Sequence, residues 1–101
     1  MAIFNMVSNT DSVVLDPKTI KRKYPEVRVI VLDDDFNTFE HVANCLETII
    51  PGMSRERSWK HALEVDRDGS AEVWRGPLEQ AELYHQQLLR EGLTMAPIEK
   101  I

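Results

Sequence analysis

The sequence predicts a small α+β domain with the element order β-α-α-β-α-β, in which three helices pack with a three-stranded, mostly antiparallel sheet. Short segments rich in β-branched or alternating residues, at 27–32, 70–75 and 93–99, are typical of strands. Between them, apolar residues recur every three or four positions, as in amphipathic helices. The intervening segments are too short for several parallel crossovers. The 101 residues suffice for one domain.

The first strand, VRVIVL (residues 27–32), is nearly continuous in its apolarity, which indicates that at least one face is covered. A helix follows, for which we expect Asn37 as N-cap and Glu40 as its capping-box partner. Pro51-Gly52 ends this helix. Its apolar stripe consists of Phe39, Val42, Cys45, Leu46 and Ile49.

The second helix begins after Ser54, a good N-cap, and ends at Asp68-Gly69. The alternating segment SAEVWR (70–75) then predicts a short strand. We expect the buried face of this helix to contain Trp59, Ala62, Leu63 and Val65.

The third helix starts at Gly76-Pro77, where proline is tolerated in the first turn, and Gly92 is its expected C′ residue. The segment LTMAPIE (93–99) predicts a final strand, which Pro97 confines to a sheet edge. Residues 1–25 carry no sustained periodicity, so we predict a flexible arm before a core domain at 26–101. The expected inner face of the third helix is Leu78, Ala81, Tyr84, Leu88 and Leu89.

Composition excludes several classes of protein. The net charge of −5 argues against nucleic-acid binding, which needs a basic face. A single cysteine, Cys45, permits no internal disulfide or cysteine-rich zinc site, and its apolar neighbours indicate a buried thiol. The N-terminus lacks the features of a signal peptide, and no apolar run approaches the roughly 20 residues that span a bilayer, so we expect a cytoplasmic protein.

No arrangement of catalytic residues is visible. The three histidines, His41, His61 and His85, lie far apart without a metalloprotease or nucleophile-elbow motif. All four glycines lie at element boundaries, so no glycine-rich phosphate loop exists. The pattern favours a binding protein that is not an enzyme and needs no cofactor.

Three consecutive aspartates, Asp33–Asp35, follow the first strand, and three explanations for them compete. Helix capping accounts for one or two, because carboxylates interact favourably with a helix N-terminus. The second explanation is a bound metal ion. A calcium loop does not fit, because Thr38 is at the position where glycine is needed and Asn44 is at the position where glutamate is needed. A magnesium pocket of the response-regulator type would require a larger parallel sheet than this chain can form.

The third explanation is an organic cation such as an ammonium group. The last turn of the second helix carries Glu64, Asp66 and Asp68, although negative charge there is unfavourable to the helix dipole. If that helix packs beside the first strand, Asp66 faces the Asp33–Asp35 loop and completes a seat for a cation. A solvated acidic surface remains the alternative.

From Val27 to Lys100 the chain resembles the ClpS adaptors, which deliver N-degron proteins to Clp proteases. The family's strand end and following helix, Asn-Asp-Asp, an aromatic residue, two residues and Met-Glu, correspond to DDDFNTFE (33–40) here. The family's Leu-x-Val-His appears as LEVD (63–66), with Gly69 at the expected interval, and IEK (98–100) matches the usual ending.

The resemblance implies that Asp33, Asp34 and Asp66 hold the α-amino group of a substrate's first residue. It also implies docking to the N-terminal domain of a ClpA- or ClpC-type AAA+ unfoldase through a surface that includes Glu79, Glu82 and Tyr84. By position, the hydrophobic pocket for the first side chain is lined by Val31, Leu32, Asn37, Phe39, Val42, Ala62, Val65 and Thr94.

Two departures from the family pattern matter. Asp33 and Asp66 replace Asn and His, which leaves a cradle made only of hydrogen-bond acceptors. Phe39 replaces a methionine at the pocket entrance, and Ala62 replaces a larger apolar residue on its wall. The reshaped pocket leaves two hypotheses open: an adaptor that reads N-degrons, or a regulator that docks on a Clp chaperone without reading them.

Overall fold

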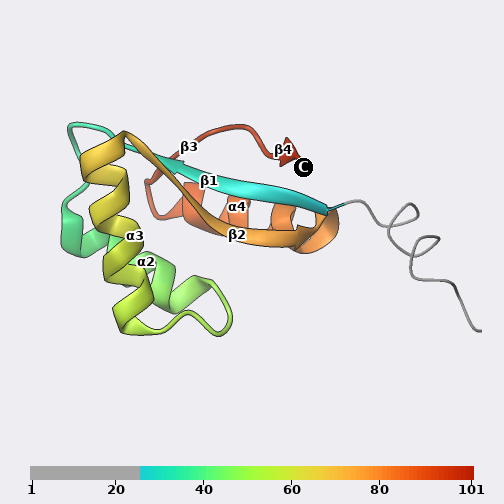
Figure 1. The fold of residues 1–101 in the computed structure, drawn as a ribbon, viewed down its shortest axis with the longest axis horizontal. Coiled ribbons are helices and arrows are strands. Elements are labelled where there is room, and N and C mark those ends of the chain that lie inside the picture. The colour runs from blue at the N-terminus through green and yellow to red at the C-terminus, as the bar shows by residue number, and fades with distance from the viewer. Residues whose placement is uncertain (1–25) are drawn as a thin grey trace, which may run out of the picture.

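The computed structural model describes residues 26–101, and the predicted flexible arm at 1–25 lies outside the described residues. The predicted α+β class and element order are confirmed (Figure 1). The elements are β1 (Glu26–Leu32), α2 (Phe39–Ile49), α3 (Arg55–Asp68), β2 (Ser70–Pro77), α4 (Leu78–Arg90), β3 (Thr94–Met95) and β4 (Glu99–Lys100).

β1 is the central strand of an antiparallel sheet. β2 pairs with β1 on one side, and the short strands β3 and β4 both pair with β1 on the other. The sheet therefore has four strands where the sequence predicted three, because the segment 93–99 is interrupted. Ala96 N still donates to Ile30 O at 3.1 Å, but Pro97 has no N–H to continue the ladder.

A β-bulge at Val73 shifts the register between β1 and β2. Val29 lies opposite Trp74, whereas Ile30 lies opposite Glu72, so Val73 is the extra residue. The bulge brings Glu72 and Arg75 together on one face, where their side chains form an ion pair at 3.0 Å. Arg28 on β1 joins them through Glu72, at 3.3 Å.

The core lies between the sheet and the helices and contains Val29 and Val31 of β1, Leu46 of α2 and Leu88 of α4, each at most 1% exposed. Cys45 is buried, as predicted. α2 is amphipathic, because its buried residues Val42, Cys45 and Leu46 recur at helical spacing.

The predicted buried face of α3 is partly wrong. Trp59 is 38% exposed and Leu63 is 54% exposed, while Ala62 and Val65 are buried as expected. Ser58 is fully buried, and its hydroxyl donates to Arg55 O at 2.7 Å. Periodicity locates the centre of an apolar stripe, but the packing of neighbouring elements decides how wide a stripe is covered.

The inner face of α4 is likewise narrower than predicted. Ala81 and Leu88 are buried, but Leu78 and Leu89 are 46% and 48% exposed. Pro77 is the N-cap of α4 and also the last residue of β2, so the helix starts one residue after the predicted proline.

The start of α2 and the end of α4 each have a defined capping residue. Thr38, not Asn37, is the N-cap of α2, and its hydroxyl accepts from His41 N at 3.1 Å. The predicted capping box with Glu40 is therefore wrong. Gly92 follows α4 at φ 90°, as expected of a C′ residue, because glycine adopts this conformation without steric cost.

Within residues 26–101, no helix has the length and apolarity to cross a bilayer.

Candidate functional site

The loop after β1 lies against the end of α3. Asp33 N donates to Gly69 O at 2.9 Å, and this bond fixes the start of the acidic loop beside the turn that follows α3. Asp66 lies in the last turn of that helix, and both Asp33 and Asp66 are exposed to solvent. Two acidic segments that are distant in sequence are thus held close by a backbone hydrogen bond.

Asp34 organises this loop. Its Oδ1 accepts hydrogen bonds from Phe36 N at 2.9 Å and Asn37 N at 2.7 Å. Its Oδ2 accepts from Asn37 Nδ2 at 2.6 Å and Thr94 Oγ1 at 2.7 Å. These four donors, foremost the backbone N–H of Asn37, hold the pKa of the Asp34 carboxyl far below its usual range. Asp34 is therefore a permanently charged anchor of the loop near neutral pH.

Asn37 and Thr94 connect that anchor to the C-terminal part of the chain. Besides its bond to Asp34, Asn37 Nδ2 donates to Gly92 O at 3.0 Å. Thr94 begins β3, which pairs with the end of β1. The acidic loop is therefore tied to β3 and to the turn before it, as well as to α3.

A small cavity of about 10 Å³ lies beside this loop. Leu93 lines this cavity, although the sequence analysis placed it only in the final strand and not in the pocket; its position between the C′ glycine and Thr94 was the signal that could have indicated it. The cavity has room for about one water molecule. Its lining consists of Val31, Leu32, Asp33, Asp34, Asn37, Val42, Val65, Leu93 and Thr94.

Three residues from the sequence prediction lie outside the lining of this cavity: Phe39, Ala62 and Asp66. The ring of Phe39 packs on Trp59 of α3, with centroids 4.6 Å apart and ring planes at 53°. Ala62 is 2% exposed within the core. The structure thus gathers most of the predicted pocket at the loop but places the Phe39 ring against α3.

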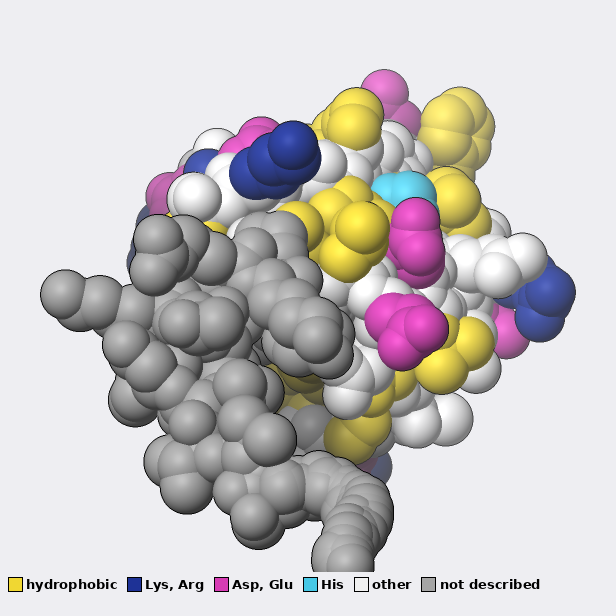
Figure 2. Space-filling model, turned by 90° about the vertical axis from the view of Figure 1, so that its right-hand side faces the viewer, with side chains coloured by type: hydrophobic (Ala, Val, Ile, Leu, Met, Phe, Trp, Pro, Cys, Tyr) yellow, Lys and Arg dark blue, Asp and Glu magenta, His cyan; other side chains and the backbone are white. Residues whose placement is uncertain are grey.

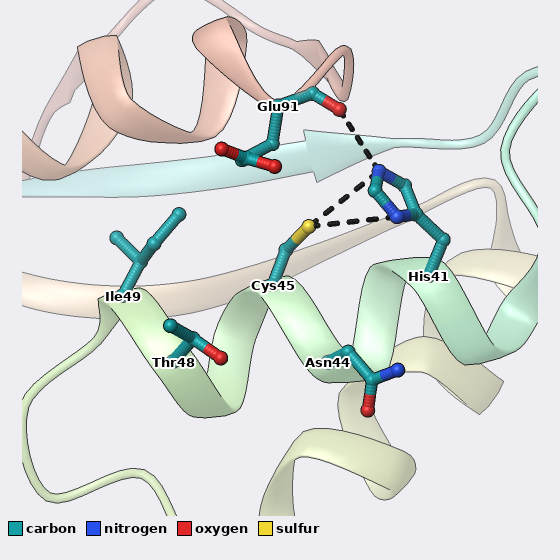
Figure 3. A pocket seen from close by; sticks show the side chains of 6 residues that line it. All are labelled: His41, Asn44, Cys45, Thr48, Ile49 and Glu91. Carbon is teal, nitrogen blue, oxygen red and sulfur yellow. Dashed lines mark hydrogen bonds between the residues drawn. The ribbon is translucent and has the colours of Figure 1, made fainter.

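A second cavity, of about 220 Å³, opens along α2 (Figure 3). Its lining comprises His41, Asn44, Cys45, Thr48, Ile49 and Glu91. His41 Nε2 lies 2.8 Å from Glu91 O, and the Cys45 Sγ lies 3.5 Å from the same nitrogen. Burial, reinforced by the nearby Glu91 carboxylate, raises the pKa of the Cys45 thiol, so the sulfur is a poor nucleophile. Among residues 26–101, no three histidine, cysteine or acidic side chains are grouped to hold a metal ion.

The helix α4 presents a mixed apolar and acidic surface. Glu79 and Glu82 are exposed, and so are Leu78 and Leu83. Figure 2 looks onto the end of the molecule where β2 passes into α4 and shows hydrophobic and acidic side chains side by side. Tyr84 is half-buried, and its ring meets that of Trp74 edge-on at a centroid distance of 5.0 Å. Of the predicted docking residues, Glu79 and Glu82 are therefore the more accessible.

Comparison with known proteins identifies relatives over most of the chain. The family model "ATP-dependent Clp protease adaptor protein ClpS" matches residues 22–96. The ClpS adapter protein of Synechocystis sp. is 57% identical over 97 residues, which cover 94% of this chain and 99% of that protein. That of Thermosynechococcus vestitus is 60% identical over 79 residues, covering 78% of this chain and 84% of its own.

Among solved structures, Agrobacterium tumefaciens ClpS2 bound to L-phenylalaninamide has the same fold. Its TM-score is 0.67 at 23% identity, over 76% of this chain and 98% of that one. Fold and sequence together define an adaptor of an ATP-dependent Clp protease. The chain belongs to the ClpS family, and it is similar to cyanobacterial members of that family.

Proposed function

We propose that this adaptor binds the free α-amino group and the bulky hydrophobic first side chain of N-degron substrates and delivers them to a Clp AAA+ unfoldase. The observation that supports the proposal best is the bond from Asp33 N to Gly69 O, which brings two acidic segments together beside a cavity lined in part by Val31, Val42 and Val65. Unfolding and cleavage of the substrate then belong to the partner proteins.

In this proposal, Asp33, Asp34 and Asp66 form the seat for the ammonium group. Asp33 and Asp66 carry exposed carboxylates that can accept its N–H groups, and Asp34 adds a third negative charge. An ammonium offers three donors, and hydrogen bonds between charged groups are about twice as strong as neutral ones. A seat made of carboxylates suits a cationic amine better than any neutral ligand.

The first side chain would enter at the cavity beside the loop, which has to widen for it. At about 10 Å³ the cavity does not hold a leucine or phenylalanine side chain as it stands. In our proposal, Phe39 leaves its contact with Trp59 as the ligand enters and, with Ala62 behind it, completes the pocket wall.

The chemistry named for the structural neighbour agrees with this proposal. L-phenylalaninamide has a free α-amino group and an aromatic side chain, and the Agrobacterium protein is described as bound to it.

In our proposal, the α4 surface with Glu79, Glu82 and Tyr84 docks on the N-terminal domain of a ClpC- or ClpA-type unfoldase.

A peptide titration tests the proposal. Peptides that begin with free leucine or phenylalanine should bind, and their N-acetylated forms should not, because acetylation removes the charge and two donors. Asp33→Asn and Asp66→Asn should each weaken the binding, whereas Mg²⁺ should have no effect. Equal binding of free and acetylated peptides would refute an ammonium seat.

The small volume of the cavity, about 10 Å³, favours one alternative, a regulator that docks on a Clp chaperone without reading N-termini. Such a protein would bind the chaperone's N-terminal domain and ignore every peptide in the titration. Measuring both interactions on the same preparation separates the two functions.

A further inference from the structure

We propose that Asn37 and Thr94 are positioning residues that, together with Asp34, form a clamp that fixes the acidic loop for a substrate ammonium; this inference rests on the proposed function. The clamp is defined by the bonds from Asn37 and Thr94 to Asp34 and from Asn37 to Gly92 O.

The acceptor capacity of Asp34 is the first step of the argument. A carboxylate has about four lone-pair positions. In this structure, two backbone N–H groups fill those of Oδ1, and the Asn37 amide and Thr94 hydroxyl fill those of Oδ2. In the proposal, Asp34 therefore acts on a bound ammonium through its negative charge, and the exposed Asp33 and Asp66 accept the direct hydrogen bonds.

The second step concerns Asn37. Its Nδ2 donates to both Asp34 Oδ2 and Gly92 O, so its amide joins the acidic loop to the turn before β3. Because Thr38 supplies the N-cap of α2, Asn37 is not needed to cap that helix. The side chain of Asn37 therefore connects the loop to the turn, in addition to lining the cavity.

The third step concerns Thr94, which lines the cavity and is 60 residues from Asp34 in sequence. Its hydroxyl fixes the loop relative to β3, and both segments contribute to the cavity wall. Since the charge of Asp34 is only useful at a defined distance from the amine, a loose loop would weaken the binding without removing any acidic group.

The experiment compares Thr94→Val, which keeps the shape but loses the hydroxyl, with Thr94→Ser, which keeps the hydroxyl. Thr48→Val, an exposed threonine of α2 away from the loop, is the matched control. Affinity for a peptide with free N-terminal leucine is measured by calorimetry, and the Asp34 carboxyl is titrated by ¹³C NMR in the absence of peptide. Thermal unfolding of each variant is recorded alongside.

Thr94→Val should weaken the peptide affinity by about tenfold, as expected for loss of a hydrogen bond to a charged group. It should also shift the titration of Asp34 to higher pH, while Thr94→Ser and Thr48→Val should behave like the parent protein. In an Asp34→Ala background, Thr94→Val should cause no further loss, because its effect passes through Asp34.

Two results would overturn the clamp. An unchanged Asp34 titration in Thr94→Val would show that the hydroxyl does not hold the carboxylate, whether or not any peptide binds. Unchanged or tighter peptide binding by Thr94→Val would show that Thr94 competes with the ammonium instead of preparing its seat. Failure of the parent protein to bind any peptide would refute the proposed function, and the titration would still decide on the clamp.

Discussion

Replacing Gly76 by alanine should destabilise the fold through a single steric overlap. An added Cβ would collide with Cη2 of the Trp74 indole and lie 2.7 Å from its Cζ2. Gly76 is buried in β2 opposite Val27, and the indole meets the Tyr84 ring edge-on at 5.0 Å, so a shift of either group would disturb its neighbours. Overpacking of this kind costs about 1–3 kcal/mol of unfolding free energy. For a domain of this size, that corresponds to a fall in Tm of about 4–8 °C for each kcal/mol.

Thermal unfolding followed by circular dichroism measures this loss, and a double-mutant cycle identifies its cause. In a Trp74→Ala background the overlap is absent, so Gly76→Ala should then cost much less. An equal loss of stability in both backgrounds, or no loss in the parent background, would refute the steric explanation. The displaced indole should also disturb Tyr84, which belongs to the proposed docking surface, so binding to a Clp chaperone provides a second measurement.

Four further predictions concern the core, the thiol, the loop and the seat. Leu46→Ala should lower the unfolding free energy by about 2–5 kcal/mol, measured in urea, because Leu46 is fully buried. Cys45 should react with a thiol reagent such as DTNB only slowly until urea unfolds the chain, because the thiol is buried and its pKa is raised. The pKa of Asp34 is depressed on folding, so its contribution to stability is present above pH ~4 and is lost as the pH falls below that value; Asp34→Asn should flatten the acid limb of a stability–pH curve. Peptide binding should weaken with added salt and below pH ~5, and Asp66→Asn should reduce both dependences, whereas binding indifferent to salt and acid would contradict a carboxylate seat.

Much of the fold could be predicted because its signals are local. The β-branched run at 27–32 and the apolar spacing of α2 predict their elements directly, since side-chain direction follows from backbone geometry. Gly92 is found at positive φ, where its lack of a Cβ removes the steric cost. The exposure of Trp59 and Leu63 could not be predicted, because it depends on how much of α3 the neighbouring elements cover.

Only part of the candidate site could be predicted from the sequence. The motif around Asp33–Asp35 identified the loop and its family, and the apolar residues Val31, Val42 and Val65, which the resemblance implied for the pocket, lie at the cavity. Asn37 and Thr94 were predicted as pocket residues, but the bonds from Asn37 to Gly92 O and from Thr94 to Asp34 could not be predicted, because they join segments far apart in the sequence. The packing of Phe39 on Trp59 likewise joins two helices.

By itself, the amino-acid order determined the succession of helices and strands, the glycine that follows α4 and the membership of the ClpS family. Only the tertiary structure decided that the Thr94 hydroxyl donates to Asp34, and that the cavity beside the loop has a volume of only about 10 Å³. The physical reason is range. Backbone preferences act over a few neighbouring residues, whereas hydrogen-bond partners and cavity volumes arise where segments far apart in the chain meet.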